Sequence, residues 1–168
     1  MSPSILHATT VAVFRNGGWA GVLLRGESGR GKSDLALRLL ATGWRLVADD
    51  RTVVWSSERR LWGRAPRTLS GLIEARTLGV ASVPSLELAP IVLAVSLVDR
   101  DETLERTPEQ GFTDILETRL PEIRIFAMQA SAAAKVAVAL SVLESRSPTG
   151  VSSLSAGPRA GLSGGGSR

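Results

Sequence analysis

The segment from Gly26 to Ser33 carries the pattern G-x-x-x-x-G-K-S, in which glycines precede an amine and a hydroxyl. The glycines let backbone N–H groups face an anion, Lys32 can reach the outer phosphates of a nucleotide, and the Ser33 hydroxyl can hold Mg²⁺. A glycine-rich turn that merely connects two elements would leave the adjacent Lys-Ser unexplained. We therefore predict a nucleotide or polyphosphate site formed by Gly26, Glu27, Ser28, Gly29, Arg30, Gly31, Lys32, Ser33 and Asp34.

A second chemical feature is the acidic pair Asp49-Asp50, 17 and 18 residues after Lys32. In an open α/β sheet, strand ends lie beside the phosphate loop, so both carboxylates are expected near the bound phosphates. One carboxylate could contact Mg²⁺, directly or through water, and the other could take a proton from an attacking hydroxyl. The alternative is a structural Asp pair that begins a turn, with Asp50 bridging to Arg51.

The elements that position these residues can be read from short apolar runs. Strands are predicted at 11–14 and 22–24, joined by a tight turn at Asn16-Gly17-Gly18, and a helix at 34–42 with Gly43 as its C-cap. Further strands are predicted at 46–48, 52–55, 60–62, 91–98 and 121–126, the run 91–98 being central, and a last helix at 131–143 with Ser131 as N-cap. Pro66 and Gly71 mark a loop.

Composition limits the class of protein. The chain has 168 residues, which suits one domain, and it has no Cys and one His, so thiolate metal sites are excluded and any metal is expected on oxygen ligands. Its net charge is +4. Three of the positive charges lie in the Gly/Ser/Pro-rich segment 145–168, which has no acidic residue, so the body is nearly neutral and no nucleic-acid partner is expected. We expect a catalytic domain at 1–144, a disordered tail at 145–168, no membrane segment and a cytoplasmic location.

The motifs together resemble one family. The phosphate loop, followed by Gly43-Trp-Arg-Leu-Val-Ala-Asp-Asp-Arg51, has the order and spacing of the catalytic domain of HPr kinase/phosphorylase. The segments 65–80, Leu6-His7 and 98–106 are similar to further motifs of that family. The match resembles the short, catalytic-domain-only members of alphaproteobacterial type. It implies an α/β, P-loop kinase-like domain with a mixed central β-sheet flanked by helices.

The resemblance also implies roles for single residues. Lys32 would neutralise the β- and γ-phosphates, and Ser33 and Glu74 would hold Mg²⁺. Asp50, with Asp49 beside it, would be the base toward the accepting serine. His7 would support that carboxylate, and Arg106 would stabilise charge on the transferred phosphoryl group. For Glu74 the alternative is a solvated ion pair with Arg76 on a loop, and for Arg106 it is a place in an exposed run of charged residues. For His7 the alternative is an ordinary surface or strand-end histidine.

The activity that the family implies is phosphorylation of a serine of an HPr-like phosphocarrier protein by ATP or pyrophosphate, with Mg²⁺. Many members also remove the phosphate by phosphorolysis, and the family implies a homo-oligomer, a hexamer. Two other functions remain open: a small-molecule kinase or NTPase, and a non-catalytic regulatory module that senses a nucleotide. The segment 126–131 departs from the family's Pro-x-Lys-x-Gly-Arg, which is associated with dephosphorylation.

Overall fold

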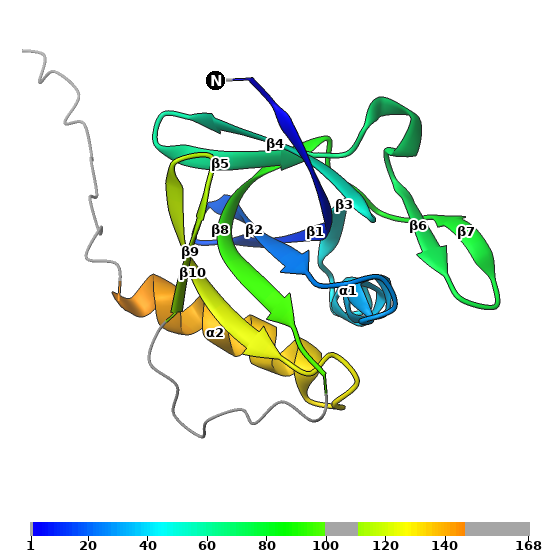
Figure 1. Cartoon of the computed structure of the whole chain (residues 1–168). Helices are drawn as coiled ribbons and strands as arrows, with labels where there is room; N and C mark the ends of the chain where they lie inside the picture. Colours follow the sequence, from blue (N-terminus) through cyan, green and yellow to red (C-terminus); the bar gives the residue numbers. More distant parts are fainter. Residues whose placement is uncertain (1, 100–110, 147–168) are drawn as a thin grey trace, which may run out of the picture.

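The structure is a computed structural model that describes residues 2–99 and 111–146 (Figure 1). Along the chain the described elements are β1 (Ser4–Arg15), β2 (Gly18–Arg25), α1 (Lys32–Leu40), β3 (Arg45–Ala48), β4 (Arg51–Ser57), β5 (Arg60–Arg64), a 3-10 turn (Arg67–Leu69), β6 (Leu72–Ala75), β7 (Gly79–Ser82), β8 (Leu88–Leu97), β9 (Gly111–Ile115), β10 (Thr118–Ile125) and α2 (Ala132–Arg146).

Strands β1 and β2 form the hairpin predicted from the sequence. Asn16 and Gly17 are its two turn residues, with φ angles of 49° and 80°, the left-handed conformation that a type I′ turn requires and that Asn-Gly favours. Beyond the hairpin, β1 pairs on its other edge with β4 along 4–7 and with β3 along 10–12. One long strand therefore brings together the end of β2, the end of β3 and the start of β4.

The predicted central strand is confirmed as β8. It pairs in parallel with β2 along 91–96, antiparallel with β5 along 88–91, and in parallel with β10 along 94–97. The sheet is therefore mixed, as predicted. Because β8 pairs with both β2 and β5, the strands β1, β2, β8, β5 and β4 close into a barrel, which the sequence did not indicate.

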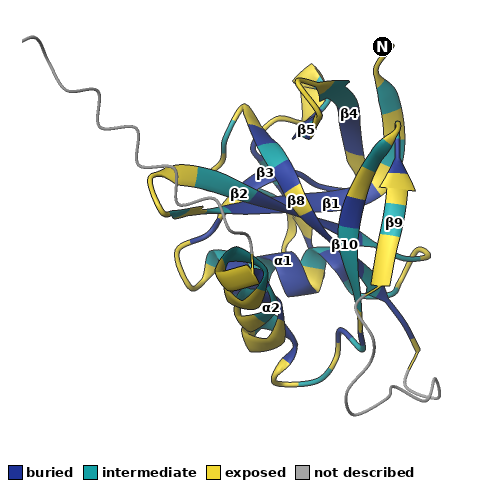
Figure 2. Cartoon of the chain, turned by 90° about the vertical axis from the view of Figure 1, so that its left-hand side faces the viewer, coloured by how far each residue is buried: buried dark blue, intermediate teal, exposed yellow. Residues whose placement is uncertain are grey.

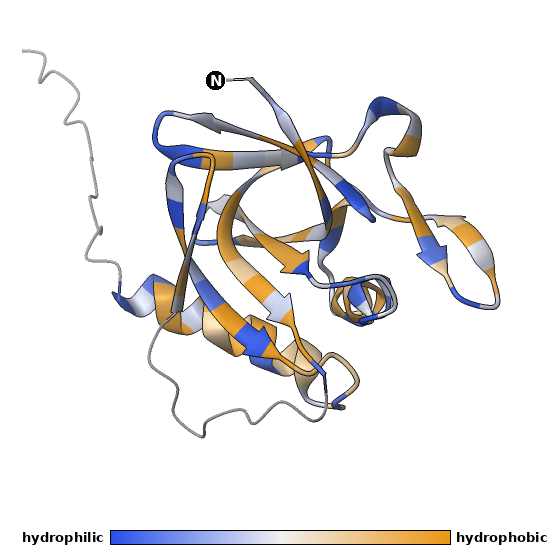
Figure 3. Ribbon diagram, viewed as in Figure 1, coloured by the Kyte–Doolittle hydropathy of each residue, from blue (hydrophilic) through white to orange (hydrophobic). Residues whose placement is uncertain are grey.

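The two faces of this sheet are covered differently. Residues of α1 and α2 share one core cluster with alternate residues of β2 and β8, such as Leu24 and Val95. The opposite face, with Leu23 and Ile91, packs inside the barrel and against β9 and β10. Figure 2 shows the buried residues on the strands and the exposed outer side of α2, and Figure 3 the mostly hydrophobic colouring of β8. The helices thus flank the mixed sheet on one face, and the barrel, which was not predicted, closes over the other.

Other differences are local. Helix α1 begins at Lys32 and ends at Leu40 with Ala41 as its cap, and Gly43 takes a φ of 93° in the turn that follows. Helix α2 begins directly after Ser131 and continues to Arg146, two residues into the segment predicted as the tail. The loop predicted around Pro66 and Gly71 leads into the β6–β7 hairpin, which projects from the barrel (Figure 1).

Arg106 and residues 147–168 lie outside the described residues. Neither described helix is long and apolar enough to cross a membrane.

Candidate active site

The glycine-rich segment lies between the end of β2 and the start of α1, as predicted. Gly26, Gly29 and Gly31 have φ angles of 152°, 83° and 87°, which other residues rarely adopt. Space is also limited, since a Cβ at Gly31 would lie 2.7 Å from Met128 Cε and one at Gly26 would lie 3.2 Å from the carbonyl oxygen of Leu97. The loop therefore turns tightly into the N-terminus of α1, where free backbone N–H groups and the helix dipole favour an anion.

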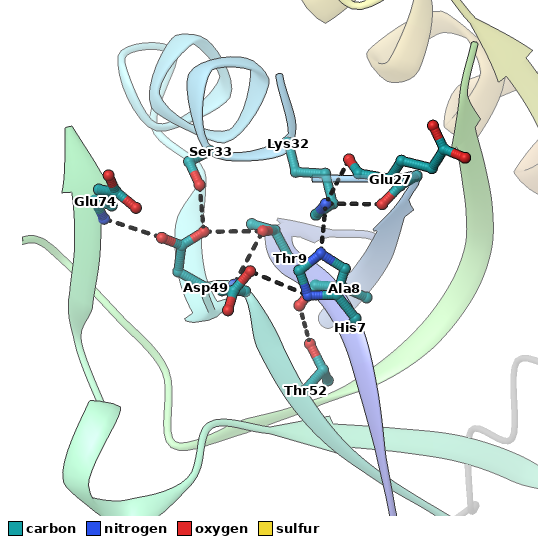
Figure 4. Close-up of polar contacts among 11 residues, drawn as sticks. His7, Ala8, Thr9, Glu27, Lys32, Ser33, Asp49, Thr52 and Glu74 are labelled. Atoms are coloured by element: carbon teal, nitrogen blue, oxygen red, sulfur yellow. Dashed lines mark hydrogen bonds and ion pairs between the residues drawn. The ribbon is translucent and has the colours of Figure 1, made fainter. Parts of the chain in front are cut away.

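Lys32, the first residue of α1, folds back over this loop. Its ammonium donates to the carbonyl oxygens of Gly26 at 2.8 Å and Glu27 at 3.1 Å, and it lies 3.2 Å from His7 Nε2 (Figure 4). The residue is only 6% exposed. Burial lowers the pKa of Lys32, and the negative charges of Asp50 and Asp49 oppose that shift.

Asp49, at the end of β3, is the centre of a hydrogen-bond network. Its Oδ1 accepts from the Thr9 hydroxyl at 2.8 Å and the Ser33 hydroxyl at 2.7 Å, and its Oδ2 accepts from the backbone N–H of Glu74 at 2.9 Å. It is 7% exposed. One buried carboxylate thereby ties together β1, the start of α1 and strand β6 (Figure 4).

Asp50 occupies a different environment from its neighbour. Its side chain is 59% exposed, and Oδ1 lies 3.1 Å from Nδ1 of His7, which is 50% exposed. Its φ of 62° turns the chain sharply between β3 and β4, so the two adjacent carboxylates lie in different surroundings. His7 on β1 thus contacts both Lys32 and Asp50.

The structure brings together His7, Lys32, Ser33, Asp49 and Asp50, all of which the sequence singled out. The side chains of three other predicted residues are engaged in ion pairs. Arg30 pairs with Glu27 at 2.9 Å and also contacts Asp99. Asp34 pairs with Arg38, also at 2.9 Å. Ser28 and Gly29 form the turn of the loop. These ion pairs join the three side chains to residues other than His7, Lys32, Ser33, Asp49 and Asp50.

Sequence reasoning missed Thr9. This fully buried residue donates its hydroxyl hydrogen to Asp49 and accepts from the backbone N–H of Asp50 at 3.2 Å, so it fixes both acidic residues. The sequence does hold a clue to this role. The Thr9-Thr10 pair lies within a strongly apolar strand, and hydroxyl groups buried in such a strand need hydrogen-bond partners.

The oxygen atoms at the start of α1 suit a magnesium ion. Ser33 Oγ and Asp49 Oδ1 are hard oxygen donors 2.7 Å apart. Within residues 2–99 and 111–146, no group of three or more His, Cys, Asp or Glu could hold a metal alone. Mg²⁺ commonly keeps several waters and takes only one or two protein carboxylates beside substrate phosphates.

Comparison with known proteins agrees with this geometry. The family model described as "HPr Serine kinase C-terminal domain" matches residues 2–154. The HPr kinase/phosphorylase of Clostridium tetani is 42% identical over 93 residues, covering 55% of this chain and 29% of that protein. The HPr kinase/phosphorylase of Clostridium acetobutylicum is 39% identical over 120 residues, covering 71% and 38%. The chain thus spans about a third of the length of these relatives.

The fold has a counterpart among solved structures. The Hpr(Ser) kinase/phosphatase from Coxiella burnetii superimposes with a TM-score of 0.73 at 23% sequence identity, over 84% of this chain and 96% of that one. At that identity the likeness concerns the fold, while the family model covers all of the described residues. The chain therefore belongs to the family of the HPr serine kinase C-terminal domain.

Proposed function

We propose that this domain is a Mg²⁺- and ATP-dependent serine kinase, acting in the cytoplasm on an HPr-like phosphocarrier protein. The observation that carries the proposal is the position of His7 between the buried ammonium of Lys32 and the exposed carboxylate of Asp50. Phosphate-binding and proton-accepting groups then lie on opposite sides of one imidazole. The names of the relatives, HPr kinase/phosphorylase, support the choice of acceptor.

In this proposal Gly26–Ser33 is a P-loop. Its backbone N–H groups and the N-terminus of α1 would bind the phosphates of ATP. Lys32, which now donates to two carbonyl groups of its own loop, would exchange these for the β- and γ-phosphates. Pyrophosphate presents the same two phosphate groups, so we extend the proposal to it as a second donor.

Ser33 and Glu74 would hold the magnesium ion, with Asp49 close enough to bind it directly or through water. Bound there, Mg²⁺ would neutralise charge on the phosphates and orient them. Asp49 already fixes the Ser33 hydroxyl and the backbone of Glu74, so it holds both ligands in place. In this proposal the main role of Asp49 is to position Ser33 and Glu74.

Asp50 would act as the base. Its Oδ1 contacts His7, and the described residues place no hydrogen bond on its Oδ2. The serine hydroxyl would give its proton to Asp50 as its oxygen bonds to the γ-phosphorus, while the bond to the bridging oxygen breaks and ADP leaves. Arg106 would stabilise charge on the transferred group. Phosphorolysis would run through the same groups, with inorganic phosphate as acceptor and pyrophosphate as product.

The test is incubation of this protein with Mg²⁺, ATP and the HPr-like protein of the same cell, followed by intact-mass spectrometry and mapping of the modified residue. We expect one added phosphate on a serine, and none with Lys32→Ala. ATP consumption that is unaffected by the acceptor, with no phosphoserine formed, would indicate a small-molecule kinase or NTPase. ATP binding without turnover would indicate a nucleotide-sensing module. We also propose the homo-oligomer, a hexamer, that the family resemblance implies, and light scattering of the same sample tests it.

A further inference from the structure

A cavity of about 410 Å³ lies beside His7 and is lined in part by Arg25, the residue that precedes the phosphate loop. Its lining residues come from β1, from the end of β2 and from the β9–β10 hairpin. Leu6, Ile115 and Leu116 provide an apolar wall. The volume lies within the range of about 300 to 1,000 Å³ that is common for ligand sites.

The rim of the cavity carries opposite charges. Arg25 NH1 donates to the Thr113 hydroxyl at 3.0 Å and lies 3.5 Å from Glu122 Oε1, which in turn accepts from Ser96 Oγ at 2.6 Å. These contacts fix the guanidinium while using one of its nitrogen atoms. Asp114, an acidic residue, also lines the cavity. Arg25 can donate hydrogen bonds and Asp114 can accept them. A negatively charged group such as Asp114 disfavours binding of a polyphosphate, whereas a donor and an acceptor side by side suit the C=O and N–H groups of a polypeptide.

Leu116 adds an independent observation. Ile115 pairs with Thr118, so Leu116 and Glu117 form a two-residue turn, and their φ angles of 45° and 63° are those of a type I′ turn. Asn and Gly favour this conformation, whereas leucine adopts it at a cost. Leu116 therefore combines an unfavourable backbone conformation with a place in the lining of the cavity. This combination indicates that the leucine side chain serves a function there.

We propose that this cavity is the docking site for the phosphoacceptor protein and receives an aliphatic side chain next to the accepting serine. The inference rests on the proposed kinase function. His7 is shared by the cavity and the Asp50 contact, so a polypeptide seated here would bring a neighbouring hydroxyl to Asp50. Leu116 and Leu6 determine specificity in this scheme, and Arg25 and Asp114 hold the acceptor backbone.

The test compares Leu116→Asn with its turn neighbour Glu117→Asn. Both changes suit the left-handed turn, but only the first makes the cavity wall polar. With the HPr-like protein as acceptor, Leu116→Asn should raise the KM for the acceptor by roughly tenfold or more, since apolar pockets discriminate on that scale. The KM for ATP and kcat at saturating acceptor should stay unchanged, because only binding common to ground and transition states is lost. Leu6→Thr, which suits a strand, should have the same effect, because Leu6 belongs to the same apolar wall.

The outcomes separate this proposal from the kinase assignment. Serine phosphorylation by the native protein, with the KM for the acceptor unaltered in both Leu116→Asn and Leu6→Thr, would leave the kinase function standing and overturn the docking site. A change in oligomeric mass without a change in that KM would overturn it too, in favour of a contact between copies of the chain. Absence of phosphorylation with the native protein would overturn both.

Discussion

His7 Nδ1 lies 3.1 Å from Asp50 Oδ1, while the other nitrogen of the same ring lies 3.2 Å from the ammonium of Lys32. An ammonium only donates hydrogen bonds, so Nε2 of the neutral imidazole is the acceptor and Nδ1 carries the hydrogen that is donated to Asp50. The ring therefore orients one oxygen of Asp50 and leaves the other for the substrate hydroxyl.

Asp50→Asn should abolish transfer without affecting nucleotide binding. The amide is isosteric but cannot take the serine proton, and we expect the rate of transfer to fall by several orders of magnitude. Asparagine tolerates the φ of 62° at this position, so the backbone should not change. The measurements are phosphoserine formation and the dissociation constant of Mg²⁺-ATP. Full activity in this variant would show that Asp50 is not the base.

Asp49→Asn, unlike Asp50→Asn, should also lower the free energy of unfolding. Three donors converge on the buried carboxylate of Asp49, from Thr9, Ser33 and Glu74, and an amide can accept through only one of its two terminal atoms. At least one buried donor loses its acceptor, so the free energy of unfolding should fall by about 1–3 kcal/mol. Asp50→Asn, at an exposed carboxylate, should stay within about 0.5 kcal/mol of the native protein. Equal losses in both variants, by denaturant unfolding, would contradict this division of roles.

The parts of the site that could be predicted are those encoded in neighbouring residues. The phosphate loop and the Asp49-Asp50 pair are local patterns, and the apolar runs on either side of them predict the strands and helix that carry them. Strands β6, β7 and β9 were missed because they are only four or five residues long, and because β7 and β9 are mostly exposed and lack a clear apolar pattern.

Barrel closure could not be predicted for a different reason. It depends on pairing of Gly21 with Ile91 and of Ile91 with Leu61, contacts between residues far apart in the chain. The same holds for Glu74, which meets Asp49 through its backbone N–H, a group that every residue except proline possesses. Residue type carries no signal for such a contact.

Gly21→Ala tests the barrel closure directly. A Cβ at Gly21 would lie 2.5 Å from the carbonyl oxygen of Pro90, a backbone atom that cannot move aside without disturbing β8. We expect the free energy of unfolding to fall by about 1–3 kcal/mol or more, as for overpacked sites. Gly18→Ala is the matched control in the same strand, because nothing lies within 4 Å of its Cβ position, and it should be neutral or slightly stabilising. Similar thermal midpoints for the two variants would argue against close approach of β2 and β8.

Because the pKa of Lys32 is lowered, we expect the free energy of unfolding to increase with pH in the alkaline range. Because burial lowers this pKa in the folded state, the unfolded chain binds more protons between that lowered value and the ordinary value of 10.5. Stability therefore rises with pH through this window and is constant below it. The window is unusually clear of other titrations, since the chain has no Tyr or Cys and its only other lysine is Lys135.

The measurement is the free energy of unfolding of the native protein minus that of Lys32→Met, followed from pH 7 to about pH 10.5. Subtraction removes Lys135 and the terminal amine, so the remaining slope belongs to Lys32. We expect the difference to increase with pH, and Mg²⁺-ATP to flatten the increase, because bound phosphates favour the charged ammonium. A difference that decreases with pH would mean that Asp49 and Asp50 outweigh burial and that Lys32 is stabilised as a cation before any nucleotide binds.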